Sequence, residues 1–238
     1  MDIKEIDIIG DYINYHWYYR SKANALLKLT KGIKKSIIID IGAGSGYFSR
    51  YLLRNTSANE AWCVDINYDT EYDCFEIYKP MYFRKKIDYI SADLVLVMDV
   101  LEHVDNDVAL LCDYISKVPR GTTFVISVPA FSFLWSSHDV FLEHKRRYSL
   151  SELEHTVRES GLHVKFSSYY YAAVFPIAAI SRLAGKFNAT DNCEPRSQLK
   201  RHSRPINKAL YAMCQAELPI LPRNRLFGLT AFCLVIAP

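Results

Sequence analysis

The stretch that most constrains the fold is residues 36–50, with the sequence SIIIDIGAGSGYFSR. Four isoleucines surround Asp40, and such a β-branched, apolar run is typical of a buried parallel strand. Gly42, Gly44 and Gly46 follow at alternate positions, where glycine lets the chain turn sharply and lets a ligand approach the backbone. The spacing G-x-G-x-G differs from the G-x-G-x-x-G that seats a pyrophosphate on a helix N-terminus. The sequence therefore predicts a loop that binds a nucleotide-like ligand, but not through a phosphate of that ligand.

A glycine turn of this kind also occurs for purely structural reasons, so other residues are needed to distinguish a ligand-binding loop from a structural turn. The next apolar run, residues 61–65, ends in Asp65, where a carboxylate can accept both hydroxyls of a ribose. The pattern D-x-G-x-G-x-G followed by V-D resembles class I S-adenosylmethionine-dependent methyltransferases, and the resemblance runs from about Tyr12 to the C-terminus. It implies S-adenosylmethionine as the cofactor. The residues that it places around this cofactor are Asp40, Gly42, Ala43, Gly44, Gly46, Asp65 and Ile66.

Composition indicates a single α/β domain over residues 1–238, because the chain is long enough and, at 50% hydrophobic residues, apolar enough to bury a sizeable core. The six cysteines form no C-x-x-C pair, which suggests a reducing, cytoplasmic setting. The N-terminus is charged and no apolar run reaches the length of a membrane span, so we expect a soluble protein. A net charge of +3 is too small to indicate a nucleic-acid partner.

Residues 1–32 are expected to form an N-terminal helical cap, with an amphipathic helix over residues 11–30. Its aromatic run, residues 17–19, either packs on the sheet edge or lies over the cofactor. In the methyltransferases that the chain resembles, such a helix closes the cofactor site and sends a basic residue to the methionine carboxylate. Arg20 and Lys22 are both placed for that role, and Arg20 is included in the predicted cofactor set.

A fourth strand, residues 93–97, leads into the sequence MDVLEH. The resemblance places Met98 and Asp99 at the methionine end of the cofactor. Asp99, Glu102 and His103 form D-x-x-E-H, which is similar to the E-x-x-E-H of the ubiquinone-biosynthesis O-methyltransferases, where it implies a divalent ion. Glu102 and His103 also suit the start of a helix predicted over residues 107–118. Three neighbours on one turn make a poor cage, so no metal is predicted, and these three residues remain the alternative ligand set.

A fifth strand, residues 122–128, is followed by a loop rich in aromatic, basic and histidine side chains. Ligands of open α/β sheets bind outside the carboxyl ends of the strands, so this loop should face the methyl acceptor. We predict His138 as the base that removes a hydroxyl proton, with the alternative that His138 and Asp139 only fix the loop. The predicted acceptor-binding residues are Trp135, His144, Arg146 and Arg147.

The remaining elements complete a Rossmann-like fold. Ser151 and Glu154 have capping-box spacing at the start of a helix ending near residue 160, and strands are predicted over residues 162–170 and 227–235. The fold class is α/β: a seven-stranded sheet in the order 3-2-1-4-5-7-6, with strand 7 antiparallel and helices on both faces. Residues 68–79 show no long helix. A helical insertion is predicted over residues 171–222.

The insertion contains a basic portion, residues 196–208, that lacks acidic residues. It is either a solvated helical cap or a docking surface for an anionic acceptor or a membrane face. We expect Phe131, Phe133 and Trp135 to face it across a cleft.

The predicted function is methyl transfer from S-adenosylmethionine, with O-methylation of a small-molecule, glycan or lipid-linked acceptor and peripheral membrane contact as a further option. The alternatives are an N-methyltransferase and a non-catalytic S-adenosylmethionine-binding protein. The G-x-G-x-G spacing argues against a nicotinamide dehydrogenase.

Overall fold

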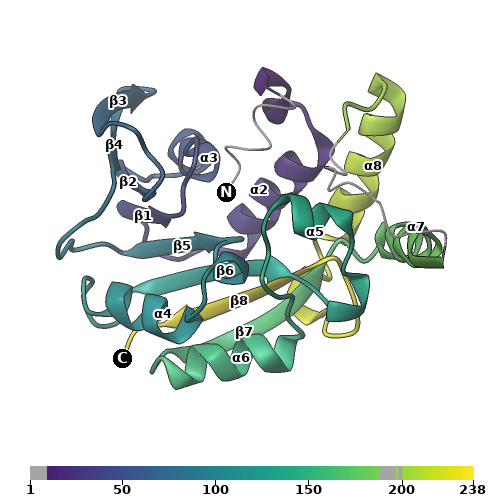
Figure 1. The fold of residues 1–238 in the computed structure, drawn as a ribbon. Coiled ribbons are helices and arrows are strands. Elements are labelled where there is room, and N and C mark those ends of the chain that lie inside the picture. The colour runs from purple at the N-terminus through teal and green to yellow at the C-terminus, as the bar shows by residue number, and fades with distance from the viewer. Residues whose placement is uncertain (1–9, 188–196, 198–199) are drawn as a thin grey trace.

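The computed structural model describes residues 10–187, 197 and 200–238. Its centre is an eight-stranded sheet with the order β3-β4-β2-β1-β5-β6-β8-β7 (Figure 1). The strands are β1 (Ile37–Ile41), β2 (Glu60–Val64), β3 (Tyr72–Glu76), β4 (Lys79–Arg84), β5 (Leu94–Met98), β6 (Thr123–Pro129), β7 (His163–Tyr170) and β8 (Thr230–Ile236).

The centre of the sheet is parallel, because β1 pairs with β2 and β5, β2 with β4, and β5 with β6 in that sense. Strand β8 runs antiparallel to both β6 and β7. The seven predicted strands therefore have the predicted order, and the last strand is antiparallel as expected. The carboxyl ends of β1, β2 and β5 lie side by side, which brings the segments after Ile41, Val64 and Met98 to one edge.

The sheet has one more strand than predicted. Strand β3 pairs antiparallel with β4 and forms the outer edge within the stretch for which no regular helix was predicted. Its hairpin turn is made by Ile77 and Tyr78, both with positive φ, 49° and 64°. Such turns are usually marked by Asn or Gly, and this one carries neither residue, so no hairpin signal is visible in the sequence.

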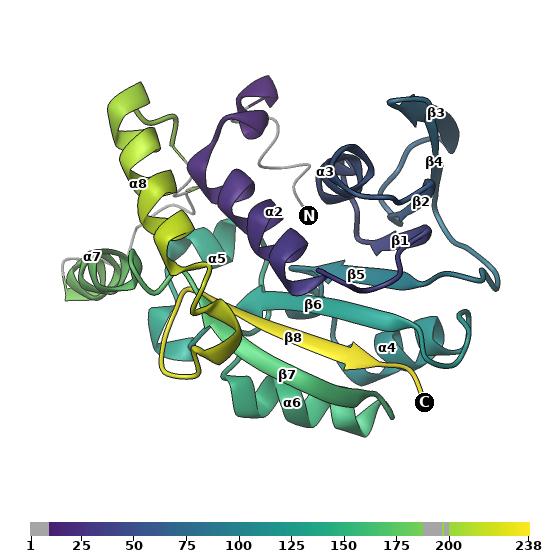
Figure 2. The same cartoon turned by 180° about the vertical axis from the view of Figure 1, so that it is seen from behind.

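Helices cover both faces of the sheet, as predicted (Figures 1 and 2). They are η1 (Gly10–Asn14), α2 (Trp17–Leu29), α3 (Tyr47–Asn55), η2 (Leu101–His103), α4 (Asp107–Ile115), η3 (Ser132–Leu134), α5 (Ser137–Phe141), α6 (Leu150–Glu159), α7 (Phe175–Phe187), α8 (Arg204–Glu217) and η4 (Leu221–Arg223).

Two apolar clusters form the core, one on each face. Strand β1 serves both, because Ile38 points into one cluster and its neighbour Ile39 into the other. The first cluster includes Leu26 of α2 and Leu52 of α3, and the second includes Leu153 of α6. This two-sided burial explains why the strand contains almost only isoleucine.

The capping box of α6 lies two residues before the predicted one. Ser149 Oγ accepts a hydrogen bond from the Glu152 amide at 3.2 Å, and the Ser149 amide donates to Glu152 Oε2 at 2.6 Å. The predicted partner Glu154 instead accepts hydrogen bonds from Arg158 and Arg225, each at 2.8 Å. Both residue pairs have the same spacing, so the spacing alone could not distinguish them.

The predicted insertion contributes α7, α8 and η4, and α8 packs along α2. Asn207 of α8 joins the two helices: its Oδ1 accepts a hydrogen bond from the Trp17 amide, and its Nδ2 donates to the Tyr15 carbonyl, both at 2.9 Å. The Asn207 side chain thus caps the start of α2. Part of the predicted basic portion, including Arg196, lies outside the described residues. Within the described ranges, no helix combines the length and the apolar character needed to cross a bilayer.

Candidate active site

The glycine loop after β1 has the tight geometry that its sequence predicts. Gly42, Gly44 and Gly46 have positive φ values of 63°, 52° and 72°. A Cβ at Gly42 would lie 2.6 Å from Val100 Cγ2, so a side chain there would displace its neighbour. The Gly42 amide donates to the Val64 carbonyl at 2.7 Å, which ties the loop to the end of β2. Glycine at position 42 is therefore required both by the positive φ and by the close approach of Val100.

Asp65 and Asp40 hold the loop from the two adjacent strands. Asp65 is buried, its Oδ2 accepts a hydrogen bond from the Gly44 amide at 3.1 Å, and its Oδ1 accepts one from the Asn67 amide at 3.0 Å. Asp40 Oδ2 accepts a hydrogen bond from Ser49 Oγ at 2.8 Å. The structure thus brings the predicted carboxylates and glycines together at one strand edge.

Two further predicted cofactor residues differ greatly in exposure. Ile66, which follows Asp65, has 81% of its surface exposed, and such an apolar side chain beside a ligand loop can cover the flat face of a base. Met98, at the end of β5, is only 3% exposed and packs in the core. Its position there makes it a support of the strand end that carries Asp99.

Of the two basic residues considered in α2, Lys22 and not Arg20 points to the strand ends. Lys22 is fully buried and forms an ion pair with Asp99, and its Nζ donates to Tyr18 Oη at 3.2 Å. Burial opposes the charge of this ammonium, but Asp99 and Tyr18 still hold the pKa of Lys22 above its usual value. Arg20 instead lies over the ring of Tyr211 in α8, 4.2 Å from its centroid.

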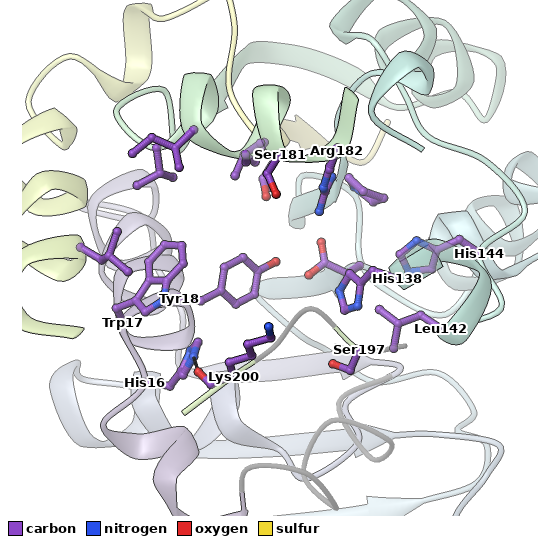
Figure 3. A pocket seen from close by; sticks show the side chains of 18 of the residues that line it. His16, Trp17, Tyr18, His138, Leu142, His144, Ser181, Arg182, Ser197 and Lys200 are labelled. Carbon is purple, nitrogen blue, oxygen red and sulfur yellow. Dashed lines mark hydrogen bonds between the residues drawn. The ribbon is translucent and has the colours of Figure 1, made fainter. Parts of the chain in front are cut away.

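Asp99 connects the glycine loop with a pocket. It has a positive φ of 56° and accepts a hydrogen bond from Ser127 Oγ at 3.0 Å, so its carboxylate is fixed from both α2 and β6. The pocket beside it has a volume of about 630 Å³, which suits a small organic molecule. Its wall combines the start of α2, the loop after β6, α7 and the side chains of Ser197, Lys200 and His202 (Figure 3). We call this cavity the acceptor pocket.

His138 lines the acceptor pocket, as expected for an acceptor-facing residue, and lies opposite Tyr18 (Figure 3). Burial, together with the positive charge of Arg182, lowers the pKa of His138 to about 4. Arg182 projects from α7 into the same space. Burial, with the charge of Arg147, in turn lowers the pKa of Arg182 to about 10. At neutral pH the pocket therefore presents a neutral imidazole beside a guanidinium group.

Asp139 organises the loop that carries His138. Its carboxylate accepts hydrogen bonds from Arg147 at 2.7 and 3.0 Å and from the Ser136 amide at 2.8 Å, and it lies 2.9 Å from His144 Nδ1. Against the effect of burial, the bonds from His144 and Arg147 hold the pKa of Asp139 well below its usual range. The part of the alternative reading that has Asp139 fixing the loop is thus observed.

Of the four predicted acceptor residues, two line the acceptor pocket and two do not. His144 and Arg147 line the acceptor pocket. Arg146 turns elsewhere, because its Nη2 donates to the Val104 and Asp105 carbonyls at 3.1 and 2.8 Å. Trp135, at the end of η3, lies outside the pocket wall. All four were predicted to bind the acceptor because they share one loop.

The expected cleft between the aromatic residues of this loop and the basic segment is not observed among the described residues. Phe131 stacks on Tyr169, with ring centroids 4.7 Å apart, and both Phe131 and Phe133 contact Phe175 of α7. The aromatic wall of the pocket comes instead from Trp17 and Tyr18. The apolar character of the loop serves to seat α7 on the sheet.

Several pocket residues were missed by the sequence reasoning. Arg182 lies in the predicted helical insertion but was given no role there, and Lys200 was predicted only as one member of the basic portion. His16 precedes the aromatic run of α2, and its Nε2 lies 3.2 Å from the Lys200 carbonyl. No local pattern marks these residues, because they meet only through the path of the insertion.

Comparison with known proteins decides the family. A family model described as a methyltransferase domain matches residues 15–165, more than half of the chain. The chain belongs to the methyltransferase domain family. The predicted family and its cofactor, S-adenosylmethionine, are thereby confirmed. A search of curated protein sequences found no match.

Solved structures of methyltransferases share the fold. One is a methyltransferase in complex with the Haloferax volcanii Trm112 methyltransferase activator, with 18% identity, a TM-score of 0.58, and coverage of 95% of this chain and 92% of that chain. Another is a SAM-dependent methyltransferase from Archaeoglobus fulgidus, with 17% identity, a TM-score of 0.51, and coverage of 92% and 93%. A third is the plantazolicin methyltransferase BamL in complex with SAH, with 10% identity, a TM-score of 0.53, and coverage of 98% and 88%.

The residues present fit S-adenosylmethionine. The glycine cradle cannot take a side chain at Gly42, and Asp65 ends the neighbouring strand as a buried carboxylate suited to ribose hydroxyls. The similarity to the ubiquinone-biosynthesis subgroup, in contrast, stays a prediction.

Proposed function

We propose that this methyltransferase transfers a methyl group to a hydroxyl oxygen of an anionic acceptor bound in the acceptor pocket. The observation that carries the proposal is the pairing of a neutral imidazole, His138, with a guanidinium group, Arg182, on the wall of one pocket that also contains Asp99. The imidazole can take a proton, and the guanidinium can bind a carboxylate or phosphate.

On the donor side, the glycine loop, Asp65 and Lys22 are proposed to hold S-adenosylmethionine. Lys22 supplies the positive charge for the methionine carboxylate, and we assign it this role in place of Arg20, which packs on Tyr211. S-adenosylmethionine supplies an electrophilic methyl group when bound. The chain's own contribution is to orient the acceptor oxygen toward that group and to exclude water.

On the acceptor side, binding of the anion should improve His138 as a base. The low pKa of His138 is caused by burial and by the charge of Arg182, and an acceptor anion paired with Arg182 would offset that charge. The pKa of the imidazole would then rise toward neutrality only in the complex. His138 would thus take the hydroxyl proton most effectively when the correct acceptor is present.

The acceptor is proposed to have an apolar portion as well. Ile177 and Ala178 of α7, with Val174 just before this helix, form one wall of the pocket, and Leu142 contributes from the loop after α5. The exposed apolar side chains Ile177 and Ile180 continue this wall at the surface. A small-molecule, glycan or lipid-linked anion with an apolar part matches such a lining better than a fully polar molecule.

A paired-substrate assay tests the proposal. Hydroxyl compounds would be offered with labelled S-adenosylmethionine, each with and without a carboxylate or phosphate, beside amine analogues of the same size. Transfer should favour the anionic hydroxyl member of each pair. Arg182→Gln should raise KM for that acceptor about tenfold or more and leave donor binding unchanged, whereas Arg120→Gln, an exposed turn residue, should behave as wild type. Transfer only to amines, or equal transfer to the neutral members, would overturn the proposal.

A further inference from the structure

A cluster of metal-ligating side chains lies beside the donor site. Glu102 and His103 of η2 and His144 of the loop after α5 each offer one ligand atom, and these atoms all lie within 4.8 Å of one another. The His103 and His144 rings meet edge to face with centroids 4.8 Å apart. The Lys145 amide donates to the Glu102 carbonyl at 2.7 Å, so the backbone itself holds the two segments together.

Glu102 has no hydrogen-bond partner for either side-chain oxygen within the part of the chain that the structure describes, although the residue is fully buried. An ionised carboxylate in such a place is costly unless a cation or hydrogen-bond donors compensate it. A cation bound beside Glu102 would supply that compensation.

His144 is oriented as a metal ligand would be. Its Nδ1 lies 2.9 Å from Asp139 Oδ1, and its Nε2 is buried without a hydrogen-bond partner among the described residues. A carboxylate oxygen that already accepts a hydrogen bond from Arg147 acts as an acceptor for His144 as well, which favours the proton on Nδ1. The Nε2 lone pair is then directed into the cluster, an arrangement common for metal-bound histidines.

We propose that Glu102, His103 and His144 bind a divalent transition-metal ion on the wall of the acceptor pocket. Two imidazoles and one carboxylate suit zinc, manganese or iron(II) better than magnesium or calcium, which prefer oxygen ligands. Asp99 is excluded from the ligand set, because its carboxylate is occupied by Lys22 and Ser127. The ligand set thus differs from the D-x-x-E-H triplet of one turn, since the third ligand comes from a distant loop.

The position of the cluster suggests what such an ion would do. Glu102 and His144 both line the acceptor pocket, so a coordination position left open by three protein ligands would face the acceptor. An acceptor oxygen bound there would lose its proton more easily. Metal binding is a property of the chain alone, so it can be measured without donor or acceptor, and its failure would leave the proposed methyl transfer untouched.

The test is a titration of chelator-treated protein with Co²⁺, followed by visible absorption, together with the metal content of the untreated protein. The wild-type protein should bind one equivalent of Co²⁺, and the bound ion should show d–d absorption bands typical of nitrogen and oxygen ligands. His144→Ala and Glu102→Gln should each weaken binding at least about 100-fold. The matched control is His155→Ala, which removes an exposed histidine of α6.

Two further measurements keep the outcome clear. Far-UV circular dichroism of each variant shows whether it is folded, and the wild-type titration decides the question even if a variant is not. The double variant Lys22→Met/Asp99→Asn should retain the site, whereas its loss would return Asp99 to the ligand set. Absence of stoichiometric binding to wild type would overturn the proposal.

Discussion

Lys22 of α2 forms a buried ion pair with Asp99, the residue that follows β5. The pair fastens the N-terminal helix to the edge of the sheet where the glycine loop and the acceptor pocket meet. It also places a positive charge at the strand ends, where our proposal puts the methionine carboxylate. The stability of the domain and the binding of the donor therefore share one residue.

Lys22→Met should destabilise the protein strongly. Removing the ammonium leaves the carboxylate of Asp99 buried without its cation, and the loss of one partner from a buried pair typically costs about 3–5 kcal/mol. Urea denaturation should show this decrease in the free energy of unfolding. Lys28→Met, on the exposed side of the same helix, should change it by less than about 0.5 kcal/mol. Recovery of most of the loss in Lys22→Met/Asp99→Asn would confirm the pairing, and a single variant as stable as wild type would contradict it.

Arg20→Ala should leave donor affinity almost unchanged. The Arg20 guanidinium packs on Tyr211, so its removal should cost only about 0.5–1 kcal/mol of stability, the usual size of an exposed cation–π contact. Calorimetric titration with S-adenosylhomocysteine checks the first expectation and urea denaturation the second. A large loss of donor affinity in Arg20→Ala would return the carboxylate-binding role to Arg20.

His16 should make the protein less stable in mild acid. Burial, partly offset by the hydrogen bond to the Lys200 carbonyl, lowers the pKa of His16 to about 4 in the folded protein, against 6.5 in the unfolded chain. The unfolded chain therefore binds more protons between these values, and the free energy of unfolding falls as pH decreases. Between pH 7 and pH 5, protonation of His16 in the unfolded chain should lower the free energy of unfolding by about 2 kcal/mol.

Urea denaturation at the two pH values measures this decrease, and His16→Gln should reduce it by about that amount. His155→Gln removes an exposed histidine and should reproduce the wild-type slope. An unchanged slope in His16→Gln would show that His16 titrates normally in the folded state.

The pH profile of kcat/KM should fall only at low pH, because His138 stays neutral down to its low pKa. The free enzyme has a His138 pKa of about 4, so activity should stay level down to about pH 5 and fall only below it, since the imidazole must be neutral to accept a proton. His138→Asn should lower turnover by about two to four orders of magnitude without changing donor affinity. Arg182→Gln should move the limb upward, because it removes a charge that depresses the pKa. A wild-type limb near pH 6.5 would contradict this assignment.

Much of the fold follows from short stretches of sequence. The isoleucine run of β1 and the glycines after it define a strand and a turn by composition alone, and the seven predicted strands occur in the predicted order. Strand β3 escaped prediction, because its turn residues Ile77 and Tyr78 lack the usual chemistry of a hairpin. Local signals are thus sufficient where one residue type is required by the backbone and insufficient where tertiary packing imposes the conformation.

The site divides in the same way. The donor loop could be predicted, since Gly42 and Asp65 lie at the ends of adjacent strands. The choice between Arg20 and Lys22 could not, because two positions along a helix differ by about 200° in direction and only the packing of α2 shows which side faces the sheet. Arg182 and His16 join the pocket from segments distant in sequence, and their approach depends on the path of the insertion.

Donor binding to Asp65 variants is the decisive measurement of whether the glycine loop and Asp65 hold S-adenosylmethionine. Calorimetry with S-adenosylhomocysteine should show saturable binding to wild type and much weaker binding of NAD. Asp65→Asn should lose about 1.5–3 kcal/mol, or about tenfold to 150-fold in affinity, because it removes a charge-assisted hydrogen bond to ribose, while the exposed Asp69→Asn should bind as wild type. Tighter binding of NAD, or full affinity in Asp65→Asn, would mean that the glycine loop and Asp65 do not form a binding site for S-adenosylmethionine.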